Sequence, residues 1–378
     1  RIGEHVDVVG LDLDSLSAVR FLMRRYAPAF TGAVVYDPDL PDTINLATTV
    51  AGLTDRIMLA PDQLSLPGME ELLEEMDQRH TPDPRVSGLP TLPEFDCVID
   101  LRELAQQQGW EATMEGQHAL YLWVFENLWP YLERRIIGVI SPGPPSSMNA
   151  FGPDSYWPLG MASRDLMVAL RVPAIYLSPV EQPAAGLFHS FLESAPAPIP
   201  ITGGVAGYEE EVTALASSHG DWQAALSWPG AILTSANLSV FAGLRPDVVR
   251  YEPEMNEDRI WATLGDDPVA TMFSTDGDAF FYLMQRGFNE SFGWVDVRDQ
   301  RFGWTINPTL AELAPVVWNT YVETRQEASL LTGLSGAGYA YPQLMSTEEL
   351  DDYLAYTARY LDDTGLRVVR IDGRKGPP

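Results

Sequence analysis

Short apolar runs alternate with stretches of helical periodicity along most of this chain. In the first hundred residues the predicted strands are 6–11, 32–36, 56–60 and 97–101, and the predicted helices are 15–26, 44–53 and 69–78. Strands separated by helices need crossover connections, which are typical of a parallel sheet. Residues 1–105 are therefore predicted to form an N-terminal α/β layer domain.

The same alternation continues through the middle of the chain. Here the pattern predicts helices at 115–129 and 162–170 and strands at 136–140 and 173–177. The segment 196–200 reads Pro-Ala-Pro-Ile-Pro, which favours a stiff, extended backbone. We interpret it as a linker that separates a middle α/β segment, 106–197, from a C-terminal domain, 198–378.

After this linker the alternation of strand and helix becomes regular. The predicted strands are 201–205, 231–235, 269–274, 302–306, 328–334 and 366–371, and the predicted helices are 209–218, 279–286, 310–324 and 347–362. Successive βα units with polar residues after the strands predict a TIM-like (β/α) barrel, whose site lies at the carboxyl ends of the strands. A barrel needs about eight strands. Either this barrel is incomplete, or earlier strands close it, or a C-terminal piece is absent.

The charge of the chain is strongly one-sided. It has 24 Lys plus Arg against 53 Asp plus Glu, a formal net charge of −29, and Lys375 is its only lysine. Nucleic acid and anionic membranes are therefore not expected partners, and lysine-based covalent catalysis is not expected either. No apolar run is long enough to span a membrane. An acidic, lysine-poor surface fits an extracytoplasmic or salty setting.

Carboxylates follow two of the predicted C-terminal strands. Asp276 and Asp278 are two residues apart, so both side chains point the same way if the strand continues. A run of three glutamates at 209–211 follows the strand at 201–205, and we take Glu210 as the one facing the same mouth. Two carboxylates at a suitable separation are the catalytic groups of a glycoside hydrolase.

Two other interpretations of the acidic triplet at 276–278 stay open. Asp276 and Asp278, together with Asn237, could supply oxygen ligands to Ca²⁺ or Mg²⁺. Alternatively, the triplet is a turn that caps the helix beginning at Ala279. No metal site is predicted from histidine, because the five histidines show no paired spacing. The lone Cys97 is predicted to be a small buried hydrophobe.

The stretch 336–342 reads Gly-Ala-Gly-Tyr-Ala-Tyr-Pro and follows a predicted strand. Its glycines permit a close approach of ligand to backbone, and its tyrosines offer rings for stacking on a sugar. A cleft lined by aromatic rings would also keep one carboxyl protonated by desolvation. The predicted substrate-binding residues are Asn237, Trp304, Asn307, Gly336, Gly338, Tyr339 and Tyr341. The alternative is a glycine-rich turn with two half-buried tyrosines.

Residues 336–342 fit the pattern GxGYxYP letter for letter, and the chain resembles the GxGYxYP putative glycoside hydrolase family. The stretches that also carry the resemblance are 34–37, 44–49, 51–53, 100–102, 126–130, 237–241, 276–278, 303–306 and 313–315. Two departures are expected to matter. Ala279 stands where the family pattern has Asn after the acidic triplet, and family members continue beyond the point where this chain ends.

The resemblance implies α/β N-terminal domains, a barrel-like C-terminal domain, and a secreted, mostly bacterial protein. The expected function is that of an extracellular or periplasmic carbohydrate-active hydrolase that needs no cofactor. A non-catalytic carbohydrate-binding or surface-assembly protein is the alternative, since an open sheet edge favours self-association. A metal-dependent hydrolase of another ester, with a divalent cation at Asp276 and Asp278, is a third hypothesis.

Overall fold

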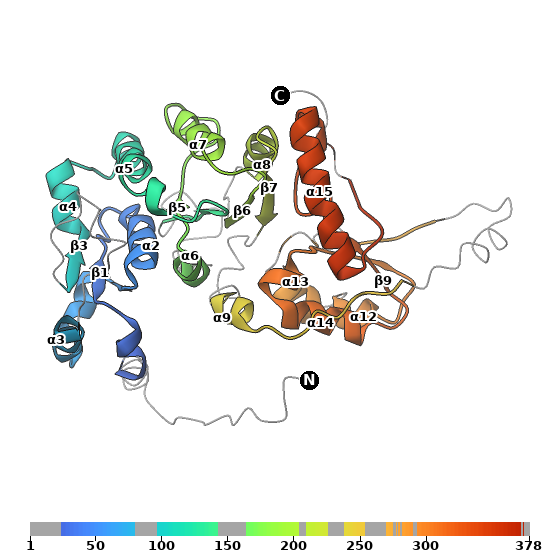
Figure 1. Ribbon diagram of the computed structural model, residues 1–378, viewed down its shortest axis with the longest axis horizontal. Helices are drawn as coiled ribbons and strands as arrows, with labels where there is room; N and C mark the ends of the chain where they lie inside the picture. Colours follow the sequence, from blue (N-terminus) through green and yellow to red (C-terminus); the bar gives the residue numbers. More distant parts are fainter. Residues whose placement is uncertain are drawn as a thin grey trace, which may run out of the picture.

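The computed structural model is an α/β protein with parallel sheets (Figure 1). It describes residues 24–79, 97–142, 164–203, 209–225, 238–253, 270–274, 277, 279, 282–289, 293–371 and 373. The predicted strands at 6–11 and 231–235 lie outside these residues, as does most of the predicted helix at 15–26. Within the described part the strands form three sheets, each entirely parallel.

The first sheet has the strand order β2-β1-β3. Its strands are β1 (Ala33–Val35), β2 (Ile57–Leu59) and β3 (Val98–Asp100), and its helices are α2 (Thr43–Thr54), α3 (Met69–Arg79) and α4 (Leu101–Gln108). Val34 packs in one core with α2 and α4, whereas Ala33 packs in another with α3. Because neighbouring residues of a strand face opposite sides, helices cover both faces. This confirms the predicted α/β layer.

The second sheet has the order β5-β4-β6-β7. Its strands are β4 (Ile137–Val139), β5 (Ala174–Ile175), β6 (Pro200–Gly203) and β7 (Trp222–Ala225), and its helices are α5 (Met114–Asn127), α6 (Arg164–Leu170), α7 (Ala184–Glu193) and α8 (Glu209–Ser217). β6 pairs with β4, so the sheet of the middle segment continues past residue 197. The proline-rich segment therefore leads directly into a strand of that sheet. The three-domain division itself remains a prediction.

The third sheet is a row of four parallel segments in chain order. β8 (Gly303–Ile306) pairs with β9 (Ser329–Thr332), and single bridges add Phe273 beside Gly303 and Arg370 beside Leu334. The helices of this region are α9 (Leu238–Gly243), α11 (Gly287–Asn289), α12 (Trp294–Val297), α13 (Leu310–Leu313), α14 (Pro315–Thr324) and α15 (Thr347–Thr364). The described residues form this row but no closed barrel.

α15 shows how local sequence determines an element. Ser346 and Glu349 form a capping box at its first turn, with the Ser346 amide donating to Glu349 Oε2 at 2.7 Å. Gly365 ends the helix with φ 80°, a left-handed conformation that glycine adopts without strain. None of the described helices is long and apolar enough to cross a membrane.

α2 lies between the first and second sheets. All of its residues except Ile44 are buried. It contacts β1 and β2 on one side and β5 and α6 on the other. Gly52 lets the backbones approach closely, since a Cβ there would lie 3.0 Å from the Val168 carbonyl oxygen. Small side chains in α2 thus allow two sheets to share one helix.

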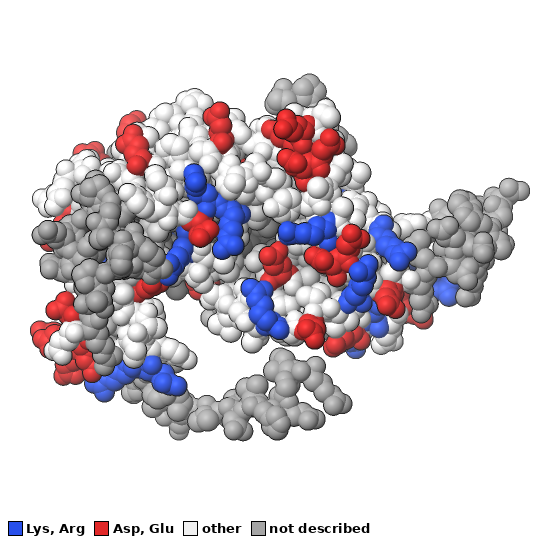
Figure 2. All heavy atoms as spheres, viewed as in Figure 1, with Lys and Arg blue, Asp and Glu red and all other residues white. Residues whose placement is uncertain are grey.

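Exposed acidic side chains gather over α3 and over one end of α15 (Figure 2). The exposed acidic residues of α3 are Glu70, Glu71, Glu74, Glu75 and Asp77. With a net charge of −29, repulsion between such groups opposes the compact state. Dissolved salt screens exposed charges over about 8 Å at physiological ionic strength and over shorter distances at higher salt.

We predict that the melting temperature rises as NaCl is increased from about 0.05 M to about 1 M, because screening relieves this repulsion. Circular dichroism melts at constant pH check it. A variant in which Glu70, Glu71, Glu74 and Glu75 are all changed to Gln should show a smaller rise. A melting temperature independent of salt in the wild type would contradict the prediction.

Candidate functional site

The carboxyl ends of the four parallel segments in the third sheet meet at one edge. Polar residues stand there, as the sequence predicted. Ser274 follows the first segment, Asn307 follows β8, and the loop at 335–342 leaves the segment that contains β9. Loops at the carboxyl ends of parallel strands are where sites form in βα folds.

A pair of hydroxyls holds one loop against β8. Thr305 Oγ1 accepts a hydrogen bond from the Gly277 amide at 3.0 Å and lies 3.0 Å from Ser274 Oγ. Ser274 Oγ in turn accepts from the Thr305 amide at 2.9 Å. A Cβ on residue 277 would lie 2.0 Å from the Thr305 carbonyl oxygen, so only glycine fits. We call Ser274, Gly277 and Thr305 the hydroxyl clamp.

The clamp holds the middle residue of the predicted acidic triplet. Asp276 and Asp278 themselves lie outside the described residues, and so does Asn237. Asn307 is buried, with 1% of its surface exposed, and its Oδ1 accepts from the Thr309 amide at 3.0 Å and the Thr309 hydroxyl at 2.7 Å. These bonds shape the turn between β8 and α13.

The two glycines of the signature loop, residues 336–342, are required by packing. Gly336 has φ 116°, and a Cβ there would lie 2.7 Å from the Thr357 side chain of α15. A Cβ on Gly338 would lie 2.2 Å from Cδ1 of Trp222 in β7. These contacts are shorter than real Cβ contacts, so the loop is pressed between α15 and the second sheet.

Hydrogen bonds complete this packing. The Tyr353 hydroxyl on α15 donates to the carbonyl oxygens of Ser335 at 2.8 Å and Gly338 at 3.0 Å. The Ala337 amide donates to Thr357 Oγ1 at 3.2 Å. Burial raises the pKa of Tyr353, so this phenol stays a neutral donor at neutral pH.

Tyr339 and Tyr341 are core residues of this arrangement. Only 6% and 3% of their surfaces are exposed, and their hydroxyls hydrogen-bond to each other at 2.8 Å. The backbone of Tyr339 forms an antiparallel bridge with Gln223 of β7, and the Tyr341 amide donates to Ser217 Oγ at 2.9 Å. The loop therefore connects the second sheet to the third.

Trp304 lies in the core of the third sheet, with 1% of its surface exposed. It stacks on Tyr282 at 6.0 Å between ring centroids and also contacts Trp294 and Tyr321. The three rings that we predicted to line an open cleft are thus packed inside the protein. Their direct contact with a sugar remains a prediction, but the described surface leaves them little area for stacking.

Glu210 is exposed in the first turn of α8. Ser217, which contacts Tyr341, is at the other end of that helix. Seven residues of α-helix span about 10 Å, so Glu210 lies well away from the tyrosine pair along α8. Its distance from Asp276 and Asp278 involves residues outside the described part.

Two parts of the chain match family models. Residues 30–132 match the second domain of GxGYxYP_N, and residues 268–376 match the GxGYxYP putative glycoside hydrolase C-terminal domain. The chain belongs to the GxGYxYP putative glycoside hydrolase family. No curated protein matches it significantly.

A solved structure shares the fold of this GxGYxYP protein. It is the crystal structure of a putative hydrolase from Bacteroides thetaiotaomicron VPI-5482, with a TM-score of 0.62 and 20% sequence identity. The match covers 91% of this chain and 56% of that one, so our chain spans little more than half the length of the relative. At this identity the likeness shows the fold alone.

A second polar cluster was not predicted from the sequence. Arg164 of α6 is buried, and its Nη1 donates to Asn45 Oδ1 and Thr48 Oγ1 of α2, both at 2.7 Å. The Asn45 side-chain amide donates to the Tyr121 hydroxyl at 2.8 Å, and that hydroxyl donates to Asp42 Oδ1 at 2.6 Å. This chain of bonds, the Arg164 network, joins α2, α5 and α6.

Burial determines the charges in the Arg164 network. It lowers the pKa of Arg164 to about 10, so the guanidinium remains cationic at neutral pH. It raises the pKa of Asp42, while hydrogen bonds from Tyr121 and Gln117 act in the opposite direction. The signal available in the sequence was an asparagine and several threonines within an otherwise apolar helix.

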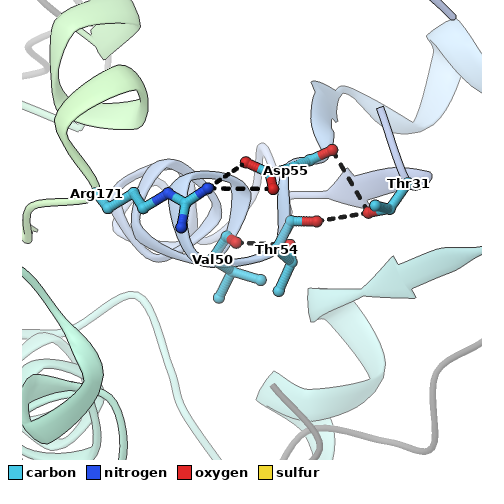
Figure 3. A network of polar contacts seen from close by, with 5 residues as sticks. All are labelled: Thr31, Val50, Thr54, Asp55 and Arg171. Atoms are coloured by element: carbon cyan, nitrogen blue, oxygen red, sulfur yellow. Dashed lines mark hydrogen bonds and ion pairs between the residues drawn. The ribbon is translucent and has the colours of Figure 1, made fainter. Parts of the chain in front are cut away.

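We predict that Arg164→Leu lowers the free energy of unfolding by about 3 kcal/mol, because it leaves the buried partners of the guanidinium unsatisfied. Urea denaturation measures it. Arg171→Leu is the matched control. Arg171 pairs with Asp55 at the end of α2, at 3.0 Å (Figure 3). Both side chains of this pair are about one-third exposed. Exposed pairs contribute up to about 1 kcal/mol. Equal losses in both variants would contradict the assignment.

We also predict that Gly338→Ala destabilises the protein by about 1–3 kcal/mol through overpacking against Trp222. Gly243→Ala is the control, because a Cβ there meets no atom within 4 Å. Thermal melts of both variants test this. A Gly338→Ala protein with wild-type stability would show that the signature loop is not held by packing.

Proposed function

We propose that the protein is a secreted hydrolase that cuts glycosidic bonds at the carboxyl edge of its third sheet. The observation that carries the proposal is the hydroxyl clamp, which fixes the residue between Asp276 and Asp278 at the end of β8. Family membership and a solved structure described as that of a putative hydrolase add support. Carbohydrate is the proposed partner, in an extracellular or periplasmic setting.

We further propose that the third sheet is part of a TIM-like (β/α) barrel. Its four segments are parallel and neighbours in chain order, which is how a barrel is built. The Arg370 guanidinium lies 5.6 Å from the centre of the Phe273 ring, so side chains of the first and fourth segments meet. Such a contact across the row agrees with a curved sheet.

In this proposal Asp276 and Asp278 are the reacting carboxylates, and Glu210 is the third candidate. One carboxyl protonates the leaving oxygen; the other attacks the sugar, or activates water where the two stand further apart. Asn237, Asn307, Gly336 and Gly338 are proposed to contact sugar hydroxyls. The buried rings of Trp304, Tyr339 and Tyr341 are proposed to act by holding these loops in place.

We predict that Asp276→Asn and Asp278→Asn each reduce turnover of a susceptible oligosaccharide by about 10²–10⁴-fold, the usual contribution of acid–base groups. Glu210→Gln should have a smaller effect. A panel of reducing-end-labelled oligosaccharides, with product detection by chromatography, measures this. Asp351→Asn, an exposed acid on α15, is the control for charge. Wild-type turnover in both aspartate variants would remove them from the site.

A non-catalytic assembly or carbohydrate-binding protein is the second candidate. It is favoured by the burial of Tyr339 and Tyr341 and by apolar side chains at the two outer segments of the third sheet. Met272 is 69% and Ile371 72% exposed, and open edges pair with other chains. Size-exclusion chromatography and electron microscopy distinguish the candidates, since a stable monomer that turns over sugar excludes assembly.

A divalent cation at Asp276 and Asp278 is the remaining variant of the proposal. In the part of the chain that is described, no three His, Cys, Asp or Glu side chains are arranged around one metal position. Both aspartates lie outside that part. Retention of full activity in a chelator would exclude a catalytic cation.

A further inference from the structure

Two histidines from different helical segments meet at the surface of the second sheet. His189 of α7 and His219, two residues after α8, place Nδ1 and Nε2 2.8 Å apart. At this distance one nitrogen carries a proton and donates it in a hydrogen bond to the other nitrogen. Both ring nitrogens therefore point at the same position, with the ring centres 5.0 Å apart.

Carboxylates surround this pair. Glu193 is four residues after His189 in α7, so its side chain lies on the same face one turn further along. Glu349 of α15 packs beside Gly220, where a Cβ would come within 3.0 Å of it. Both carboxylates favour a positive charge at His219. The position shared by the two imidazoles is therefore in a negative field.

Imidazole nitrogens bind metal ions in their neutral form, through the lone pair. The shared proton lies between Nδ1 of His189 and Nε2 of His219. A metal ion that replaces this proton would therefore meet one nitrogen from each ring.

We propose that His189, His219 and Glu193 form a binding site for a divalent transition-metal ion, with Zn²⁺ as the reference ion. The ion takes the place of the shared proton. Zn–N bonds are about 2.0–2.1 Å long, so at a tetrahedral angle the two nitrogens must separate by about half an ångström. His189 is exposed and can move by this amount.

Glu193 completes the set by a change of rotamer. As the side chains stand, no three such groups in the described ranges close on one metal position. Glu193 is exposed, and its helical spacing from His189 brings its carboxylate within reach of the same ion. Two imidazoles and one carboxylate are ligands typical of Zn²⁺, whereas Mg²⁺ and Ca²⁺ prefer oxygen alone. A bound ion would link α7 to the end of α8.

Calorimetric titration of ZnCl₂ into tag-free protein at pH 7.5 tests the proposal, which does not depend on the hydrolase activity. We expect one strong site with micromolar affinity in the wild type. His189→Ala and His219→Ala should each weaken it by roughly tenfold or more, since even the outer partners of metal ligands contribute that much. Glu193→Gln should weaken it less. Binding should also weaken as the pH is lowered, because protons compete with Zn²⁺ for nitrogen ligands.

His118→Gln is the matched control, because this histidine is in α5, outside the cluster, and its loss should leave the affinity unchanged. MgCl₂ is the control ion and should not compete. Circular dichroism shows whether each variant is folded. Absence of Zn²⁺ binding, or wild-type affinity in both single histidine variants, would overturn the site. Unchanged affinity in Glu193→Gln would overturn the three-ligand set.

Discussion

The Arg164 guanidinium is the contact on which the arrangement of the first two sheets depends. It is a buried cation whose Nη1 donates to two side chains of α2, Asn45 and Thr48. Its Nη2 donates to the Ser141 carbonyl oxygen at the end of β4. Burying a charge is costly unless its donors find partners. Nη1 and Nη2 find theirs where α2, α6 and β4 meet, whereas the buried Nε has no hydrogen-bond partner among the described residues. The helix shared by two sheets is thereby held in one orientation.

The signature loop holds the second and third sheets together in a similar way. Tyr339 pairs with β7 through its backbone, Tyr341 contacts α8, and Gly336 receives the Thr357 side chain of α15. The glycines and tyrosines of the pattern thus each have a packing reason. The pattern that names the family is a structural connection within the described residues, and the chemistry has to be sought in the loops that it holds.

Much of the secondary structure could be predicted because its signals are local. The strand at β8 and the helix at α15 follow from apolar periodicity and from a capping box, and both lie where predicted. The orientation of side chains was harder to predict from the sequence. Trp304 follows a glycine in a strand, and alternation alone does not say which face the helices cover. The tyrosines of a glycine-rich loop give the same sequence pattern whether they line a cleft or fill a core.

Contacts between distant residues could not be predicted at all. His189 and His219 are 30 residues apart, and only the tertiary fold brings them together. The proline-rich segment was interpreted as a linker because an extended backbone is its local preference. That same preference suits the first residue of a strand, where proline loses no ladder bond, and β6 begins at Pro200.

The hydroxyl clamp is independent of the signature loop, so the case for activity at this edge does not depend on that loop. Its bonds connect Ser274, Gly277 and Thr305, and none of them involves residues 335–342. The loop is held by two side-chain hydroxyls and by Gly277, where no side chain fits. It therefore has a defined position at the end of β8, as groups that act on a substrate require. A helix cap needs only one side-chain oxygen and no second strand, whereas the clamp joins this loop to β8 through two side chains. The case for chemistry at this edge therefore depends on the clamp more than on the aromatic rings.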